Sequence, residues 1–233
     1  MSQNKMDPNK TARIAGLLYV LLIPLGVFGI MYIPSTLIVP GDAAATASKI
    51  IANESAFRFS IVSALLTQLV NLWLVLFLYK LLKPVNKNYA VLMVVFIMVA
   101  VPIAMVNELN NIAVLMLLSN HEYLSEFSSQ QLQALVPFFL DLHESGINLA
   151  GIFWGLWLFP MGYLVYKSGF IPKLIGVLLV IACVGYLLDS FIYFIIPNVG
   201  FAFSEYLFFG EIAISFWLLI KGVDIAQWEK YAV

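Results

Sequence analysis

The sequence predicts an all-α fold, a polytopic membrane bundle of six transmembrane helices with both termini on the cytoplasmic side. The first reason is composition: 62% of the 233 residues are hydrophobic and 11% are charged, whereas soluble domains are about 45–50% apolar and about 25% charged. The second reason is a series of apolar segments long enough to cross a bilayer. The third is the uneven distribution of lysine and arginine between the loops.

Six apolar segments are expected to span the membrane within a single integral membrane domain that covers residues 1–233. A helix rises about 1.5 Å per residue, so about 20 residues cross a hydrocarbon core of about 30 Å. The third and fourth segments exceed this length, and we expect both to extend beyond the membrane on the same side. The expected spans are residues 14–33, 59–82, 89–118, 132–166, 171–196 and 205–220.

The first outer loop is expected to hold a short helix within residues 40–56. Asp42 precedes a run of alanines and is well placed as its N-cap, because an aspartate side chain accepts hydrogen bonds from the free N–H groups of a helix start. Farther along the chain, Gly151 and Gly155 form a small-xxx-small step. Such a step predicts a packing seam where a neighbouring helix backbone approaches closely.

Positive charge predicts the orientation, because cytoplasmic loops of membrane proteins carry an excess of lysine and arginine. With the N-terminus inside, only Lys49 and Arg58 of the 12 lysines and arginines fall on the outer side. Most acidic residues fall in the outer loops or the outer parts of helices, so the outer half is the polar half. The cytoplasmic residues are Lys5, Lys10, Arg13, Lys80, Lys83, Lys87, Lys167, Lys173, Lys221 and Lys230.

Three ionisable residues interrupt the apolar fourth segment: Asp141, His143 and Glu144. Ionisable side chains are costly to bury in a bilayer, so they are functional candidates by default. Asp141 and Glu144 share one helix face, whereas His143 lies about 200° around the helix from Asp141. His143 therefore joins the same site only if the helix is distorted near Gly146 or if another helix supplies its partners.

Other expected helices contribute polar side chains to the outer half, and a pocket between the third, fourth and fifth helices is the arrangement we expect. The structural alternative is that these groups only form bonds across helices, at about 0.6 kcal/mol each. The candidate ligand-binding residues are Asp141, His143, Glu144, Asp189, Glu108, Asn107, Asn111 and Glu211.

No metal, cofactor or catalytic residue is assigned from the sequence. Zinc sites use about three or four protein ligands, and the chain has two histidines and one cysteine. A zinc site would therefore have to combine His143 with Asp141 and Asp189. The sequence contains no Gly-x-Ser-x-Gly motif of a serine hydrolase.

Six short stretches form recognisable motifs: Thr11–Tyr19, Leu37–Thr46, Leu81–Lys87, Asp141–His143 with Gly146, Gly162–Gly169 with Pro172, and Gly185–Ser190. Together they resemble a family of uncharacterised bacterial multi-span membrane proteins classed as a domain of unknown function. The resemblance implies a compact bundle of six or seven helices in a bacterial inner membrane. Among the polar residues it picks out Asp141, His143 and Asp189, and it implies no activity.

The expected function is that of a receptor or transporter-like protein, which binds a small or amphiphilic molecule in an outward-facing polar pocket. The expected environment is a lipid bilayer, and the net charge of -1 argues against a nucleic-acid partner. Two alternatives stay open: an intramembrane, metal-dependent hydrolase of a lipid-like substrate, and a structural or accessory membrane protein. The hydrolase alternative predicts that Asp141, His143 and Asp189 surround one point.

Overall fold

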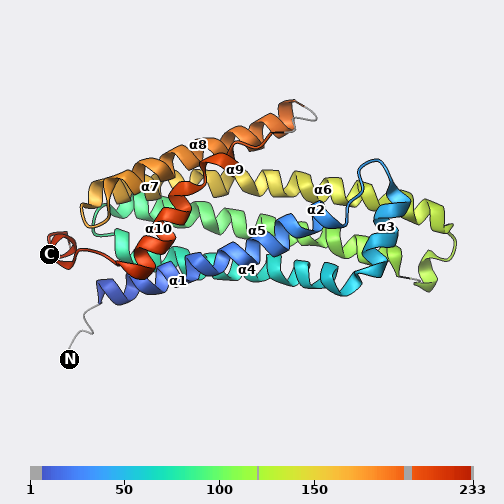
Figure 1. Cartoon of the computed structure of the whole chain (residues 1–233), viewed down its shortest axis with the longest axis horizontal. Helices are drawn as coiled ribbons and strands as arrows, with labels where there is room; N and C mark the ends of the chain where they lie inside the picture. The colour runs from blue at the N-terminus through green and yellow to red at the C-terminus, as the bar shows by residue number, and fades with distance from the viewer. Residues whose placement is uncertain (1–6, 120, 197–200, 232–233) are drawn as a thin grey trace. The chain divides into compact units, whose positions relative to one another are not determined.

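The computed structural model describes residues 7–119, 121–196 and 201–231, and all regular secondary structure in these ranges is helical (Figure 1). The all-α prediction is therefore confirmed for the described chain. The helices are α1 (Pro8–Gly26), the π-helix η1 (Val27–Tyr32), α2 (Ile33–Thr36), α3 (Ala43–Ala52), α4 (Glu54–Leu82), α5 (Lys87–Leu118), the 3-10 helix η2 (Glu122–Leu124), α6 (Ser129–Leu156), α7 (Leu158–Ser168), α8 (Lys173–Ile195), α9 (Ser204–Leu207), α10 (Phe209–Ile220) and α11 (Ile225–Glu229).

Within the described residues, five helical stretches are long and apolar enough to cross a membrane. The predicted membrane-type helical fold is confirmed in this sense. The segment expected as a sixth span folds as α9 and the 12-residue α10. At about 1.5 Å per residue, α10 is about 18 Å long, shorter than a core of about 30 Å. A six-span topology therefore stays a prediction. The five stretches are Pro8–Thr36, Glu54–Leu82, Lys87–Leu118, Ser129–Ser168 and Lys173–Ile195.

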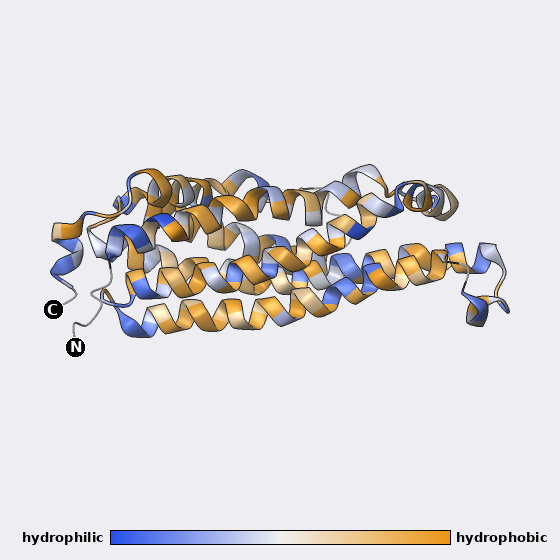
Figure 2. Ribbon diagram, turned by 90° about the horizontal axis from the view of Figure 1, so that it is seen from below, coloured by the Kyte–Doolittle hydropathy of each residue, from blue (hydrophilic) through white to orange (hydrophobic). Residues whose placement is uncertain are grey.

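Large hydrophobic side chains are exposed on each of these five stretches. Leu17, Trp73, Val106, Phe138 and Leu174 are between 55% and 68% exposed. Figure 2 shows hydrophobic residues along most of the length of the long helices, with hydrophilic residues more frequent near their ends. Extended exposed apolar surface of this kind marks a membrane-facing protein. The environment of the protein is therefore a lipid bilayer.

The chain divides into two compact units. Unit 1 consists of Met1–Leu22, Val70–Val101 and Asn148–Val233, and unit 2 consists of Ile23–Leu69 and Pro102–Ile147. Helices α1, α4, α5 and α6 each supply residues to both units. That the whole chain forms a single membrane domain stays a prediction.

In unit 1, α6 packs closely against α8 at two glycines. A Cβ on Gly151 would lie 2.8 Å from the Ser190 Oγ, and one on Gly155 would lie 2.9 Å from the Tyr186 Cβ and 3.3 Å from the Cys183 carbonyl oxygen. These positions leave no room for a larger side chain. The packing seam predicted for Gly151 and Gly155 is confirmed.

The segment after α10 bonds to the ends of three other helices of unit 1, which brings those ends together. They are the start of α1, the end of α4 and the end of α7, all of which were expected on the cytoplasmic side. Lys5, which was counted with them, lies outside the described residues. The bonds run from Val223 N to Asn9 Oδ1 (2.8 Å), from Trp228 Nε1 to the Leu81 carbonyl oxygen (2.9 Å) and from Tyr231 OH to the Lys167 carbonyl oxygen (2.9 Å).

Unit 2 has a hydrophobic core to which α2, α3, α4, α5 and α6 contribute. Helix α3 enters this core through Ile50, which is almost fully buried. The N-cap predicted for Asp42 is confirmed, because its side chain accepts a hydrogen bond of 2.8 Å from Ala45 N. The buried residues of the core are Ile33, Leu37, Ile50, Phe57, Ile61, Val114, Leu115, Val136 and Leu140.

Candidate functional site

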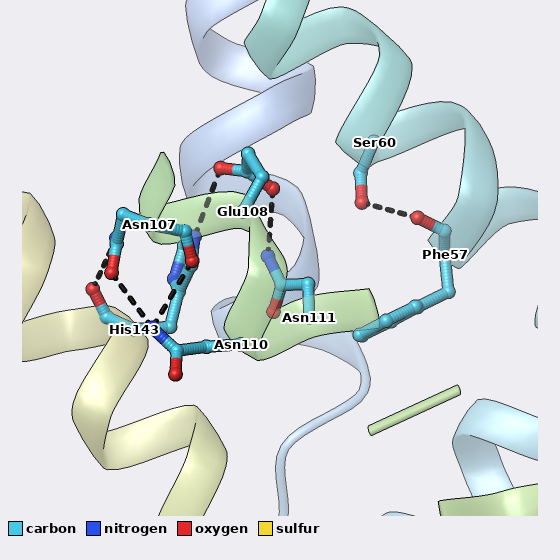
Figure 3. Close-up of polar contacts among 7 residues, drawn as sticks. All are labelled: Phe57, Ser60, Asn107, Glu108, Asn110, Asn111 and His143. Carbon is cyan, nitrogen blue, oxygen red and sulfur yellow. Dashed lines mark hydrogen bonds and ion pairs between the residues drawn. The ribbon is translucent and has the colours of Figure 1, made fainter. Parts of the chain in front are cut away.

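A buried carboxylate–imidazole pair joins α5 to α6 inside unit 2. His143 Nε2 lies 3.0 Å from Glu108 Oε1, and Figure 3 shows the two side chains pointing toward each other. Glu108 is 3% exposed although it carries an ionisable group. Carboxylates are almost never this deeply buried unless they are paired. The pair is an ion pair when the imidazole is protonated and a neutral-donor hydrogen bond when it is not.

Amide side chains of α5 surround this pair. Asn111 Nδ2 donates to Glu108 Oε2 at 3.0 Å, so both carboxylate oxygens have a partner. Asn107 Nδ2 donates to the backbone carbonyl of His143 at 2.8 Å, and Asn110 Nδ2 donates to the Asn107 side-chain oxygen at 3.0 Å. The i, i+3 and i+4 spacing of these residues places them within one turn of α5. Asn111 thus bonds to the Glu108 carboxylate and Asn107 to the His143 backbone (Figure 3).

Gly146 makes the approach of α6 to α5 sterically feasible. A Cβ at this position would collide with the Asn107 side chain, whose Nδ2 lies 2.8 Å from the Cβ position. Gly146 lies one turn after His143 on α6, and because it has no side chain, the Asn107 amide fits against it. Another helix, α5, thus supplies the partner of His143. This was one of the two possibilities stated for His143 in the sequence analysis, the other being a distortion of its own helix near Gly146.

Asp141 and Glu144 are exposed on the surface of α6. The Asp141 backbone carbonyl accepts a hydrogen bond from Ser145 Oγ at 2.9 Å. His143 is therefore the member of the Asp141, His143 and Glu144 group that faces α5. Of the eight candidate residues, the structure brings together Glu108, His143, Asn107 and Asn111.

Asp189 belongs to unit 1 and contacts backbone rather than other candidate residues. Its Oδ1 accepts a hydrogen bond of 2.6 Å from Phe203 N, and its Oδ2 accepts one of 2.7 Å from Ser204 N. These N–H groups precede and begin α9, where a helix has no internal acceptors for them. In the described structure Asp189 therefore anchors the segment that enters α9. Its role in ligand binding stays a prediction.

Glu211 also belongs to unit 1 and lies beside two tyrosines. Tyr19 OH of α1 donates to Glu211 Oε1 at 3.0 Å, and Tyr186 of α8 lies near the same carboxyl group. The Tyr19 ring packs at 6.0 Å from the Trp157 ring. This carboxyl group thus connects α1 to α10 through the Tyr19 hydroxyl group, with Tyr186 of α8 nearby.

Unit 2 also contains an apolar groove of about 610 Å³ between α4 and α5. Ile61, Val62, Ile112, Leu115 and Met116 form its walls, and Arg58, Ser119 and His121 supply the polar groups of its lining. Arg58 forms an ion pair of 2.7 Å with Glu54. Ile112 and Leu115 follow Glu108 by four and seven residues, so they share its face of α5.

Comparison with known proteins identifies the family. A family model described as a domain of unknown function, DUF4386, matches residues 14–222. The chain belongs to the DUF4386 family. An uncharacterised protein from Archaeoglobus fulgidus is 33% identical over 171 residues, which cover 72% of this chain and 87% of that protein. No solved structure matches the chain.

The family assignment confirms the resemblance on which Asp141, His143 and Asp189 were singled out, and it brings no activity. In this DUF4386 chain, the described residues contain no group of three or more His, Cys, Asp or Glu side chains that could hold a metal ion. His143 has one carboxylate partner, Glu108, and Asp189 is occupied by backbone N–H groups. The donor set expected for a metal-dependent hydrolase is therefore not found in the described part of the chain.

Tyr19 and Tyr186 were missed in the sequence of this DUF4386 protein. Both lie in apolar helices, where the aromatic ring accounts for their presence and the hydroxyl group is easily overlooked. A tyrosine hydroxyl within an apolar span needs a hydrogen-bond partner, and Glu211 in another apolar helix needs donors. That mutual requirement is the signal that could have paired Tyr19 with Glu211.

Proposed function

We propose that this DUF4386 protein is a membrane receptor or transporter-like protein that binds a small amphiphilic molecule through its outer polar half. The observation that carries the proposal is the buried Glu108–His143 pair with its amide partners. Replacing a buried ion pair by well-packed apolar side chains is often neutral or stabilising, so stability alone is a weak reason for its presence. Ionisable groups inside membrane helices are functional candidates by default.

The groove between α4 and α5 supports an amphiphilic rather than a purely polar ligand. Its volume of about 610 Å³ falls within the range of about 300–1,000 Å³ typical of ligand sites. The apolar part of a ligand would lie against Ile112 and Leu115, which follow Glu108 on the same face of α5. A polar group at the inner end of that ligand would compete with the His143 imidazole for Glu108. Asp141 and Glu144 are further candidates at the α6 surface.

The proposed setting is a bacterial cytoplasmic membrane, with six spans and both termini in the cytoplasm. The lysine and arginine distribution supports this orientation, as does the contact of the segment after α10 with the ends of α1, α4 and α7. Glu108 lies 21 residues beyond Lys87 on α5, or about 30 Å along the helix. In this orientation Glu108 and its partners lie near the outer boundary of the membrane.

The test is native mass spectrometry of protein purified from membranes, wild type beside Glu108→Gln and His143→Gln. We expect an amphiphilic molecule bound to the wild type and depleted in both variants. Glu126→Gln is the matched control, because Glu126 is an exposed acidic residue of the same unit. A wild-type protein without a bound molecule, or equal occupancy in all variants, would contradict the proposal.

A double variant separates binding from a purely structural role. Glu108→Leu with His143→Leu removes both ionisable groups, so no unpaired charge is left buried, and the fold is expected to be retained or stabilised. If the pair only holds α5 to α6, this variant keeps whatever activity or ligand the wild type has. Under the binding proposal it is folded and carries no ligand.

A further inference from the structure

A second groove, of about 540 Å³, lies between α1 and α10 in unit 1. Its α1 wall carries Lys10 and Arg13, followed by Ile14 and Leu17, and Leu219 of α10 faces them. The spacing of three, four and seven residues places the four α1 side chains along one helix face. The groove is therefore cationic at its rim, next to the start of α1, and apolar beyond it.

The crossing of α1 and α10 fixes the shape of this groove. A Cβ on Gly16 would lie 2.7 Å from the Leu219 Cα, so the two helix backbones are in direct contact there. Leu17, which follows Gly16, and Leu219 both line the groove beside this contact. Leu17 is 58% exposed, so this part of the groove is open to the surrounding lipid.

Other described residues do not neutralise the charges at the rim. Neither Lys10 nor Arg13 forms an ion pair with another described residue. Asp7 also lines the groove, but its Oδ1 accepts hydrogen bonds from Asn9 N at 2.9 Å and Lys10 N at 3.1 Å. Its carboxylate is thus directed to the start of α1, where the helix dipole favours negative charge. An occupant complementary to this groove is anionic at one end and apolar at the other.

We propose that this groove binds an anionic phospholipid of the surrounding membrane. The phosphate group contacts Lys10 and Arg13, and one acyl chain lies along Ile14, Leu17 and Leu219. Basic side chains beside the polar face of a bilayer attract anionic headgroups, and clustered cations at a groove mouth localise that attraction. The site is in unit 1 and is independent of the ligand proposed for Glu108 and His143.

The test is a lipid-binding titration of the full-length protein in detergent, followed by native mass spectrometry. The probes are dimyristoylphosphatidylglycerol and dimyristoylphosphatidylcholine, which share acyl chains and differ in headgroup charge. We expect the wild type to prefer phosphatidylglycerol, and added salt to weaken this preference. For Lys10→Gln with Arg13→Gln, we expect binding of phosphatidylglycerol to weaken about fivefold per residue, or about 25-fold for the pair.

The matched control is Lys80→Gln with Lys83→Gln, which makes the same charge change near the end of α4. Lys80 lies over the Phe77 ring at 5.3 Å and Lys83 over the Tyr79 ring at 5.8 Å. This control is expected to bind phosphatidylglycerol as the wild type does. Equal loss in both double variants, no loss in the Lys10 and Arg13 variant, or equal binding of the two lipids by the wild type would overturn the proposal. Thermal unfolding without added lipid checks that both double variants are folded.

Discussion

Replacing Gly146 by alanine is expected to destabilise unit 2, because the added methyl group would collide with the Asn107 side chain. The Cβ would lie 2.8 Å from Asn107 Nδ2 and closer still to its Oδ1. Asn107 must then move, and the hydrogen bond of 2.8 Å from its Nδ2 to the His143 carbonyl is lost. The substitution therefore acts on the support of the Glu108–His143 pair without changing either residue.

The expected loss of stability combines two destabilising contributions and one stabilising contribution. Overpacking a close contact costs about 1–3 kcal/mol, and the lost hydrogen bond costs about 0.5–1.5 kcal/mol. Alanine in a helix interior is more favourable than glycine by about 0.5–1 kcal/mol. The net loss in the free energy of unfolding centres on about 2 kcal/mol, and for a chain of this size the unfolding midpoint falls by roughly 4–8 °C. Thermal unfolding in detergent, followed by circular dichroism, measures this shift.

Gly26→Ala is the matched control, because Gly26 has helical dihedral angles and a Cβ there would have no neighbour within 4 Å. This substitution is expected to raise stability slightly. Adding Asn107→Ala to Gly146→Ala removes the colliding side chain, so the double variant should be more stable than the two single losses together imply. A Gly146→Ala protein at least as stable as the wild type would refute this account of the α5–α6 contact.

Three further substitutions test other contacts. Asp189→Asn leaves one side-chain oxygen where two accept backbone hydrogen bonds, so a loss of about 1.5–3 kcal/mol is expected, with faster proteolysis of the segment before α9. Tyr19→Phe removes a donor to Glu211 and should cost about 1–3 kcal/mol in the same unfolding assay; an unchanged midpoint would show that the hydroxyl contributes nothing. Trp228→Phe removes the bond to the Leu81 carbonyl, which should cost about 0.5–1.5 kcal/mol and expose the segment after α10 to protease; equal protection in variant and wild type would contradict this contact.

Local features were predictable from the sequence because they depend on neighbouring residues. The N-cap at Asp42 and the seam at Gly151 and Gly155 follow from short spacings within one helix. Long apolar runs likewise gave five membrane-length stretches. The sixth run is equally apolar, but its helical part is interrupted between α9 and α10, which hydropathy does not register.

Partners between helices were not predictable in the same way. His143 and Glu108 are 35 residues apart, and which of several polar residues on α5 faces His143 depends on the rotation and register of two packed helices. The sequence placed Glu108 and His143 in the same polar half but could not pair them. Asp189 was grouped with them because of its polarity. In the structure, both of its carboxylate oxygens instead accept hydrogen bonds from backbone N–H groups at the start of α9.

The contacts made after α10 have a consequence for how unit 1 is assembled in the cell. The bond between Val223 and Asn9 joins residues 214 apart, and that between Trp228 and Leu81 joins residues 147 apart. A chain is synthesised from its N-terminus, so the ends of α1 and α4 are inserted long before these partners exist. Closure of this end of the unit is therefore a late step of biogenesis, and a ribosome-bound chain that ends at Ile220 would present those helix ends to the insertion machinery still unclosed.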